Sequence, residues 1–143
     1  MMLTRYTDYG LRALMLLASD PDRVQPAISL SKQLNVSRHH LAKILQDLVA
    51  GGYLVSVRGV AGGVQLANPP EQIRLGEVVR YLARDHALVE CFHKNGGNCS
   101  LRQICQLRRA LGEAQEAFIV SLNDHSIADI SVLMAAERGA LSG

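Results

Sequence analysis

The hydrophobic residues near the start of the chain recur every three or four positions, the spacing of one face of an α-helix. The stripe runs from Tyr6 to Ala18. Thr4 precedes it as a good helix-capping residue, and Pro21 lies just beyond it, where a helix does not easily continue. The pattern therefore predicts a first helix, with Asp8 on its polar face.

Two shorter helices are expected next. The first covers residues 29–34, and a turn at Asn35 leads to Ser37, which can cap the second. The apolar stripe of this third helix consists of Leu41, Ile44, Leu45 and Leu48, and its opposite face of Arg38, His39, His40, Lys43 and Gln46. Two short helices joined by a tight turn, the second basic on its free face, indicate a helix-turn-helix.

A β-hairpin is expected after the third helix. The β-prone residues 53–58 and 64–66 flank a glycine-rich stretch, which suits a hairpin with a glycine-rich tip. A helix-turn-helix followed by a hairpin is the winged-helix pattern. We therefore predict a mainly α fold with a small β-hairpin wing.

Helical spacing returns in the second half of the chain. A fourth helix is expected over residues 73–82 and a long one over residues 105–122, whose apolar residues suit packing against another long helix. A last short helix is expected over residues 127–136. We predict a winged-helix DNA-binding domain in residues 1–84, and a cysteine loop with a C-terminal dimerisation helix in residues 85–143.

Composition and charge narrow the classes of protein. The 143 residues are 48% hydrophobic, enough for one compact core with an appended element. The apolar runs are far shorter than the roughly 18 residues that span a bilayer, and a signal-peptide pattern is lacking, so we expect a cytoplasmic protein without a membrane partner. Residues 1–84 carry 10 Lys and Arg against 6 Asp and Glu, and residues 85–143 carry 5 against 7, which assigns polyanion binding to the first part. Familiar catalytic motifs are lacking, so we do not expect an enzyme.

The free face of the third helix and the hairpin tip form the expected DNA-binding surface. Major-groove contacts are expected from Ser37, Arg38, His39, His40 and Lys43, and contacts to the flanking groove or backbone from Arg58, Gly59, Gly62 and Gly63. Winged helices also bind proteins, and a basic face is often simply solvated. Charge, fold pattern and glycine-rich tip agree here, which favours double-stranded DNA as the partner.

Three cysteines in the second half of the chain are candidate metal ligands. Cys91, Cys99 and Cys105 are separated by seven and five residues across a loop that contains glycine and asparagine. Thiolates suit both an iron–sulfur cluster, for which a fourth ligand would be missing, and a zinc site completed by His93. Cysteines also serve as small buried hydrophobes, although a polar loop is a poor place to bury them.

Asp8 has two interpretations. With Arg12 one turn away it can form an ordinary exposed ion pair, and it can also act as a carboxylate ligand. Spacing within the chain does not separate these roles.

The segments described so far together resemble one family, the bacterial winged-helix repressors that carry an iron–sulfur cluster. The resemblance covers nearly the whole chain, and its motifs are residues 3–4, 7–14, 36–44, 57–66, 88–92 and 128–130, with Cys99 and Cys105. Within the family the sequence is most similar to the nitric-oxide-sensing repressors.

The resemblance implies a cofactor and its ligands. Cys91, Cys99 and Cys105 would hold an iron–sulfur cluster, of the 4Fe–4S type in preference to 2Fe–2S. The partner subunit's Asp8 would complete the ligand set, with Arg12 beside it. Some relatives use a histidine shortly after the third cysteine, and this sequence has none there. His93 is a reserve ligand, because the spacing of the first two cysteines is longer than in some relatives.

The resemblance also implies a function. A homodimer, paired through its long helices, would repress transcription from a two-fold-related operator with half-sites about one DNA turn apart. The cluster-loaded form would bind DNA, and nitric oxide would destroy the cluster and release repression. The alternatives are an iron- or redox-responsive regulator on the same scaffold, a zinc-stabilised winged-helix DNA-binding protein and a cluster-carrying electron-transfer protein.

Overall fold

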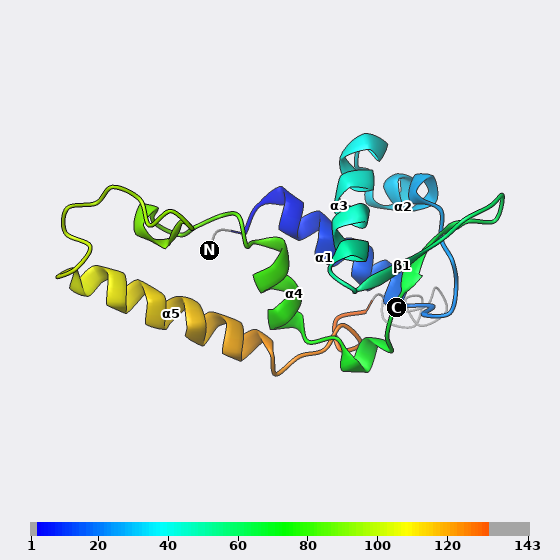
Figure 1. Cartoon of the computed structure of the whole chain (residues 1–143). Coiled ribbons are helices and arrows are strands. Elements are labelled where there is room, and N and C mark those ends of the chain that lie inside the picture. Colours follow the sequence, from blue (N-terminus) through cyan, green and yellow to red (C-terminus); the bar gives the residue numbers. More distant parts are fainter. Residues whose placement is uncertain (1–2, 132–143) are drawn as a thin grey trace.

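The computed structural model describes residues 3–131 of the chain. Its elements in order are α1 (Arg5–Ala18), α2 (Ala27–Leu34), α3 (Arg38–Ala50), β1 (Leu54–Val57), β2 (Gly63–Leu66), η1 (Pro70–Gln72), α4 (Leu75–Leu82), η2 (Glu90–Phe92) and α5 (Gln106–Leu122). Helices α1 to α4 and the hairpin form a winged helix, and α5 extends away from it (Figure 1). The mainly α fold with a small β-hairpin wing is confirmed.

The predicted helix caps are present in the structure. The Thr4 hydroxyl accepts a hydrogen bond from the Thr7 amide, and the Ser37 hydroxyl accepts one from the His40 amide. Asn35 ends α2 in the left-handed conformation, with φ of 55°. Helix α2 begins two residues earlier than predicted, directly after Pro26, and the turn between α2 and α3 has the expected length.

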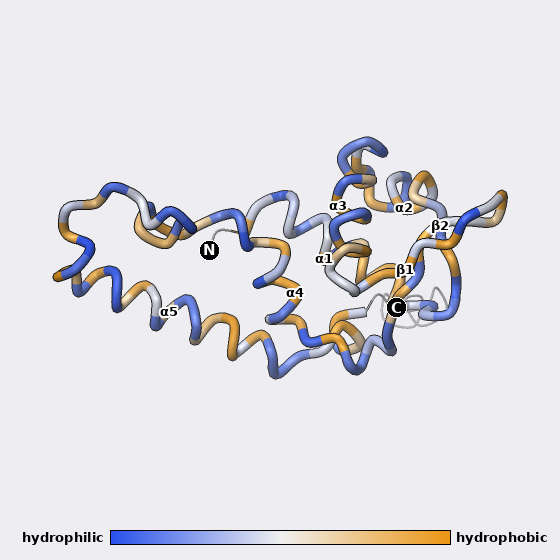
Figure 2. The backbone as a smooth tube through the Cα atoms, viewed as in Figure 1, coloured by the Kyte–Doolittle hydropathy of each residue, from blue (hydrophilic) through white to orange (hydrophobic). Residues whose placement is uncertain are grey.

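One hydrophobic core joins the helices and the base of the hairpin. All four residues of the predicted α3 stripe are buried in it, and Leu14, Leu17, Leu30, Leu54 and Val78 contribute from the other elements. Figure 2 shows the hydrophobic residues gathered where α1, α3 and β1 meet. Burial on this scale supplies most of the folding free energy, at about 1.5–3 kcal/mol for each large aliphatic side chain. Burial of one face of α3 therefore fixes the orientation of its exposed face.

The wing is a two-stranded antiparallel hairpin. Leu54 pairs with Leu66, and Val57 pairs with Gly63. An isolated bridge between Gln25 and Val64 attaches the hairpin to the segment before α2. The wing therefore has a fixed base and a free tip, which projects beyond α2 and α3 in Figure 1.

Helix α5 packs against α4 at one end only. Ile119 is buried in the core, and the Asn123 side chain accepts a hydrogen bond from the Glu77 amide at 3.0 Å. Leu107 and Phe118, two residues of the predicted dimerisation face, are 63% and 39% exposed. A large apolar surface of α5 is thus open to solvent in the single chain.

The prediction of a helix over residues 127–136 is wrong where it can be compared. Residues 127–130 form turns, because the Ser126 amide donates to the Asp129 carboxylate and the Ile127 amide donates to the Ile73 carbonyl. The second bond engages the Ile127 amide in a tertiary contact, so this amide does not form a helical hydrogen bond. Residues 132–136 lie outside the described residues. In residues 3–131, no helix is long and apolar enough to cross a membrane.

Candidate DNA-binding face and cysteine segment

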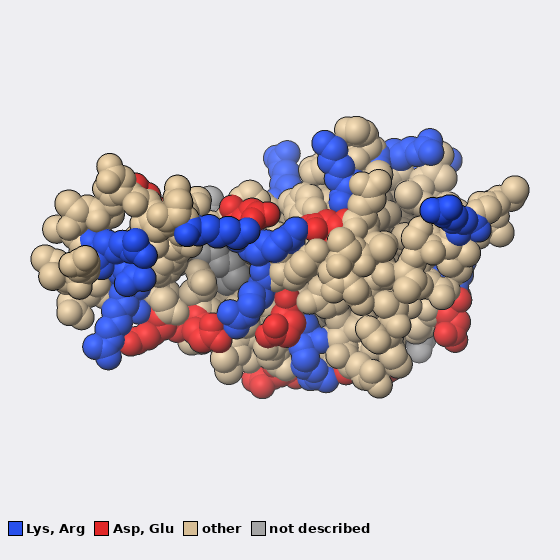
Figure 3. All heavy atoms as spheres, viewed as in Figure 1, with Lys and Arg blue, Asp and Glu red and all other residues tan. Residues whose placement is uncertain are grey.

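The outer side of α3 carries the residues predicted to enter the major groove. Ser37, Arg38, His39 and Lys43 are exposed, while the opposite side of the helix is buried. Figure 3 shows Lys and Arg side chains projecting from the edge formed by α2 and α3, with the acidic side chains lower on the molecule. This edge therefore presents positive charge on a helix narrow enough for the major groove.

His40 differs from the other residues of this group. Its ring is half-buried and lies edge-on against Tyr9 of α1, with centroids 5.7 Å apart, and it also approaches Tyr6 at 6.5 Å. His40 thus contributes to the packing between α1 and α3, a role that its position on the polar face did not predict.

The wing tip is open, and its base is tightly packed. Arg58 and Gly59 are exposed, and Gly59 has φ of 109°, which a residue with a side chain rarely adopts. Gly62 and Gly63 are half-buried, and a methyl group on Gly63 would collide with the Gln25 carbonyl. The two later glycines therefore have a structural reason for being glycine, whereas Arg58 and Gly59 are free to meet a phosphate.

The three cysteines lie on the segment that connects α4 to α5. Cys91 is in η2, Cys99 is exposed on the following loop, and Cys105 is the N-cap of α5. All three are free thiols. Cys105 accepts a hydrogen bond from the Arg108 amide at 3.4 Å, at the helix end that favours negative charge.

A turn in this segment joins the neighbourhoods of two cysteines. The Asn98 amide donates to the Glu90 carboxylate at 2.8 Å, so the residues immediately before Cys91 and Cys99 are bonded to each other. Gly97 makes this closure feasible, since its φ is 63° and a methyl group there would collide with Glu90. The long spacing between the first two cysteines is therefore taken up by a compact turn.

The third cysteine approaches the same region from α5. The Phe92 ring packs on α5, where a methyl group at Gly112 would lie 3.8 Å from its Cζ atom, and Phe92 and Cys105 line one shared hollow. Within residues 3–131, however, no three His, Cys, Asp or Glu side chains are close enough together to hold a metal ion. The expected convergence of three thiolates is thus not formed by the single chain.

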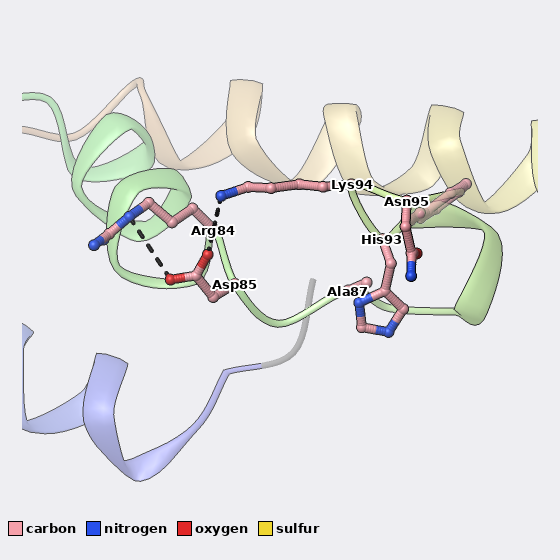
Figure 4. Close-up of a pocket in the computed structure, with 7 residues that line it drawn as sticks. Arg84, Asp85, Ala87, His93, Lys94 and Asn95 are labelled. Atoms are coloured by element: carbon pink, nitrogen blue, oxygen red, sulfur yellow. Dashed lines mark hydrogen bonds and ion pairs between the residues drawn. The ribbon is translucent and has the colours of Figure 1, made fainter. Parts of the chain in front are cut away.

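The donor chemistry nevertheless fits an iron–sulfur cluster. Three reduced, accessible thiols lie on one short segment held at both ends, and metal binding commonly supplies the free energy that draws such ligands together. His93 is exposed and lines a different hollow with Arg84, Asp85 and Lys94 (Figure 4). His93 thus lines the hollow next to the one that Cys105 lines, and Phe92 lines both.

Asp8 forms the ion pair that its spacing allowed. Its two carboxylate oxygens accept from Nε and Nη2 of Arg12 at 3.0 and 2.8 Å, and both side chains are about half exposed. The Arg12 guanidinium also lies 5.9 Å from the Tyr9 ring centroid. Asp8 is thus positioned by Arg12 and remains accessible from outside the chain.

One polar cluster was not predicted from the sequence. Asp47 of α3 turns toward α1 and α4 and accepts hydrogen bonds from Tyr6, Tyr81 and Arg84. Burial opposes the charge, but these hydrogen bonds outweigh it and lower the pKa of Asp47 below its usual value. Burial and the bond to Asp47 raise the pKa of Tyr6 to about 12. The partners are 34 to 41 residues away, so no local pattern signals the cluster.

Known proteins share this arrangement of sequence and fold. The profile of the Rrf2 family, described as an iron-dependent transcriptional regulator, matches residues 3–132. The transcriptional regulator NsrR of Geobacillus kaustophilus is 41% identical over 131 residues, which cover 91% of this chain and 89% of that protein. NsrR of Bacillus subtilis is 37% identical over 131 residues, covering 91% and 90%. Among solved structures, CymR, the global cysteine regulator of B. subtilis, aligns with a TM-score of 0.69 at 21% identity, covering 92% of this chain and 96% of that one.

These similarities decide the family. The profile spans almost the whole chain, the two NsrR proteins are related along nearly their full lengths, and CymR shares the fold. The relatives are transcriptional regulators with a helix-turn-helix, in agreement with the expectation that the chain is not an enzyme. The chain belongs to the Rrf2 family of transcriptional regulators.

Proposed function

We propose that this regulator is a nitric-oxide-responsive repressor that carries an iron–sulfur cluster on Cys91, Cys99 and Cys105 and acts in the cytoplasm. The observation that carries the proposal is the combination of two separate features in one chain. A basic recognition helix lies at one end, and three free thiols lie on a segment at the other end (Figure 1). The hydrophobic core includes none of these thiols, which leaves them available to hold a cofactor.

Residues 1–84 would bind DNA, and residues 85–143 would hold the cluster and pair two subunits. The exposed apolar residues Leu107 and Phe118 of α5 would be covered by the same helix of a second copy. Two copies would present two α3 helices to a two-fold-related operator. Arg58 at each wing tip would then contact the flanking groove.

The ligand set would use the chain's own thiols and one carboxylate from across the dimer. Cys91 and Cys99 flank the turn closed by Glu90 and Asn98, and Cys105 would enter from the start of α5. The partner subunit's Asp8 would fill the fourth position, presented by Arg12 on the accessible side of α1. A four-iron cluster matches four ligands, and it supplies iron atoms with which nitric oxide reacts.

Two alternative functions use the same scaffold. The family description favours iron, and the motif resemblance to nitric-oxide-sensing members favours nitric oxide over iron supply or general redox state as the signal. A zinc-stabilised winged helix would use His93 as the fourth ligand beside the three cysteines. The description of the family as iron-dependent favours the cluster over zinc.

Spectroscopy and DNA binding of one anaerobic preparation test the proposal. We expect a brown protein with broad visible absorption and about four iron atoms per chain. Operator DNA is selected from a pool of random duplexes with the iron-loaded protein. The affinity of the protein for this DNA is then measured before and after addition of nitric oxide. We expect nitric oxide to abolish both the affinity and the visible absorption. Colourless protein with one zinc per chain, or affinity that nitric oxide leaves unchanged, would overturn the proposal.

A further inference from the structure

Arg84 connects the recognition helix to the start of the cysteine segment. It lies two residues after the end of α4 and seven residues before Cys91, and its guanidinium donates two hydrogen bonds to the Asp47 carboxylate of α3. Nη2 lies 2.7 Å from Oδ1 and Nη1 lies 3.1 Å from Oδ2. A two-point contact of this kind fixes direction as well as distance. We call it the Asp47–Arg84 fork.

The fork is more shielded than the other ion pairs of residues 3–131. The Asp47 side chain is only 15% exposed, the lowest value for any partner in those pairs. Tyr6 and Tyr81 donate to its remaining positions at 2.7 and 2.9 Å, and the Arg84 guanidinium lies 4.2 Å from the Tyr81 ring centroid. Screening by water and salt is reduced at such a site, so this pair is expected to matter more than an open surface pair.

Weaker contacts continue from the fork into the cysteine segment. Asp85 lies 3.9 Å from Arg84 and accepts from Lys94 at 3.3 Å (Figure 4). Both side chains of the second pair are largely exposed, so it contributes little by itself. The firm link between the segment and α3 is therefore the fork together with the short run of chain from Arg84 to Cys91.

We propose that the Asp47–Arg84 fork transmits the state of the cysteine segment to the recognition helix. The inference rests on the proposed function. A rearrangement around Cys91 would displace Arg84, which must then either carry the end of α3 with it or release Asp47. Each outcome changes how α3 is presented to DNA. Coupling between the cysteine segment and α3 requires a contact that differs between the iron-loaded and iron-free states, and the fork would be that contact. Asp47 and Arg84 are thus positioning residues, and they do not themselves touch DNA or iron.

Variants of the fork test the inference through one ratio. The ratio compares operator affinity of iron-loaded protein with that of iron-free protein. We expect Arg84→Gln and Asp47→Asn each to lower it at least about fivefold, within the usual range of coupling between sites. The double variant should lower the ratio no further than either single variant, because each single substitution already removes the same contact. Arg84→Lys, which keeps the charge without the two-point geometry, should give an intermediate ratio.

A matched control comes from α4, the helix that precedes Arg84. Arg80 makes an equally two-pronged pair with Glu116, at 2.9 and 3.2 Å, but it faces α5 instead of α3. Arg80→Gln should leave the ratio unchanged. An unchanged ratio in Arg84→Gln, or an equal fall in Arg80→Gln, would overturn the inference. Thermal unfolding of each variant shows whether it is folded.

Hydrogen exchange of iron-free protein separates this inference from the proposed function. Arg84→Gln should speed amide exchange in the last turn of α3 and in residues 85–90 at least about threefold, since local opening loses a stabilising contact. Arg80→Gln should not. If wild-type affinity does not depend on iron, the proposed function fails, and with it the transmitted signal. If affinity depends on iron but Arg84→Gln changes neither exchange nor ratio, only the fork is wrong.

Discussion

Tyr9 of α1 meets His40 of α3 edge-on, with their rings at 81° and their centroids 5.7 Å apart. The contact joins the helix that carries Asp8 to the first turn of the recognition helix. His40 is half-buried, whereas its neighbour His39 is exposed. Two adjacent histidines of one DNA-binding helix are therefore expected to behave differently when each is replaced.

His40→Ala should lower the free energy of unfolding by about 1 kcal/mol, the scale of a lost aromatic pair with its buried area. His39→Ala serves as the matched control and should leave stability nearly unchanged while weakening operator binding. Urea denaturation and fluorescence anisotropy measure the two properties. Equal losses of stability in both variants would contradict the structural role of His40.

Arg58→Ala should weaken binding to DNA of any sequence. If Arg58 contacts one phosphate, the plot of log affinity against log salt should become shallower by about one unit. Affinity is measured over a series of salt concentrations. Arg5→Ala, an exposed change at the start of α1 and outside the expected DNA face, is the control. An unchanged slope would remove Arg58 from the interface.

Replacing any one of the three cysteines by serine should prevent stable iron binding without unfolding the protein. The core consists of residues from the winged helix, the α4-proximal end of α5 and Ile127 in the turns after it, and it includes none of the cysteines. Iron analysis measures the loss of iron, and circular dichroism shows whether the fold is retained. Ser100→Ala in the same segment is the control. A serine variant with full iron content would show that its cysteine is not a ligand.

Asp8→Ala should keep iron but disturb its link to DNA. An oxygen donor binds iron less tightly than a thiolate, so water or a small thiol can replace it. We expect an altered visible spectrum and a smaller difference in operator affinity between iron-loaded and iron-free protein. Glu116→Ala removes a comparable exposed pair with Arg80 and is the control. Unchanged spectrum and affinities would leave Asp8 as a surface ion-pair partner only.

Tyr6 should make stability depend on pH in the alkaline range. Its pKa is raised to about 12 by burial and by Asp47, whereas tyrosine in an unfolded chain ionises near pH 10. The stabilising protonated form is therefore fully present below about pH 10 and is lost as pH rises through about 12. Urea denaturation across this range should show a smaller loss for Tyr6→Phe than for wild type. Tyr9→Phe, whose hydroxyl is not a donor to Asp47, should retain the wild-type loss.

Local sequence determined the helices, their caps and the hairpin. Thr4 and Ser37 cap helices through residues three positions away, and the α3 stripe repeats at helical spacing, so neighbouring residues carry the information. The same holds for the division between a basic face and a buried one. Motif resemblance then led to the family, which the relatives confirm.

Only the tertiary structure decided which distant groups meet. Residues 127–130 form turns and not the predicted helix, because the Ile127 amide donates to the Ile73 carbonyl. Asp47 turns toward α1 and α4, because Tyr6, Tyr81 and Arg84 donate hydrogen bonds to it. Helical periodicity reports which side of a helix is apolar, but it does not report which partner a polar side chain finds across the core. The three thiols show the same limit, since their spacing along the chain does not determine their convergence in space.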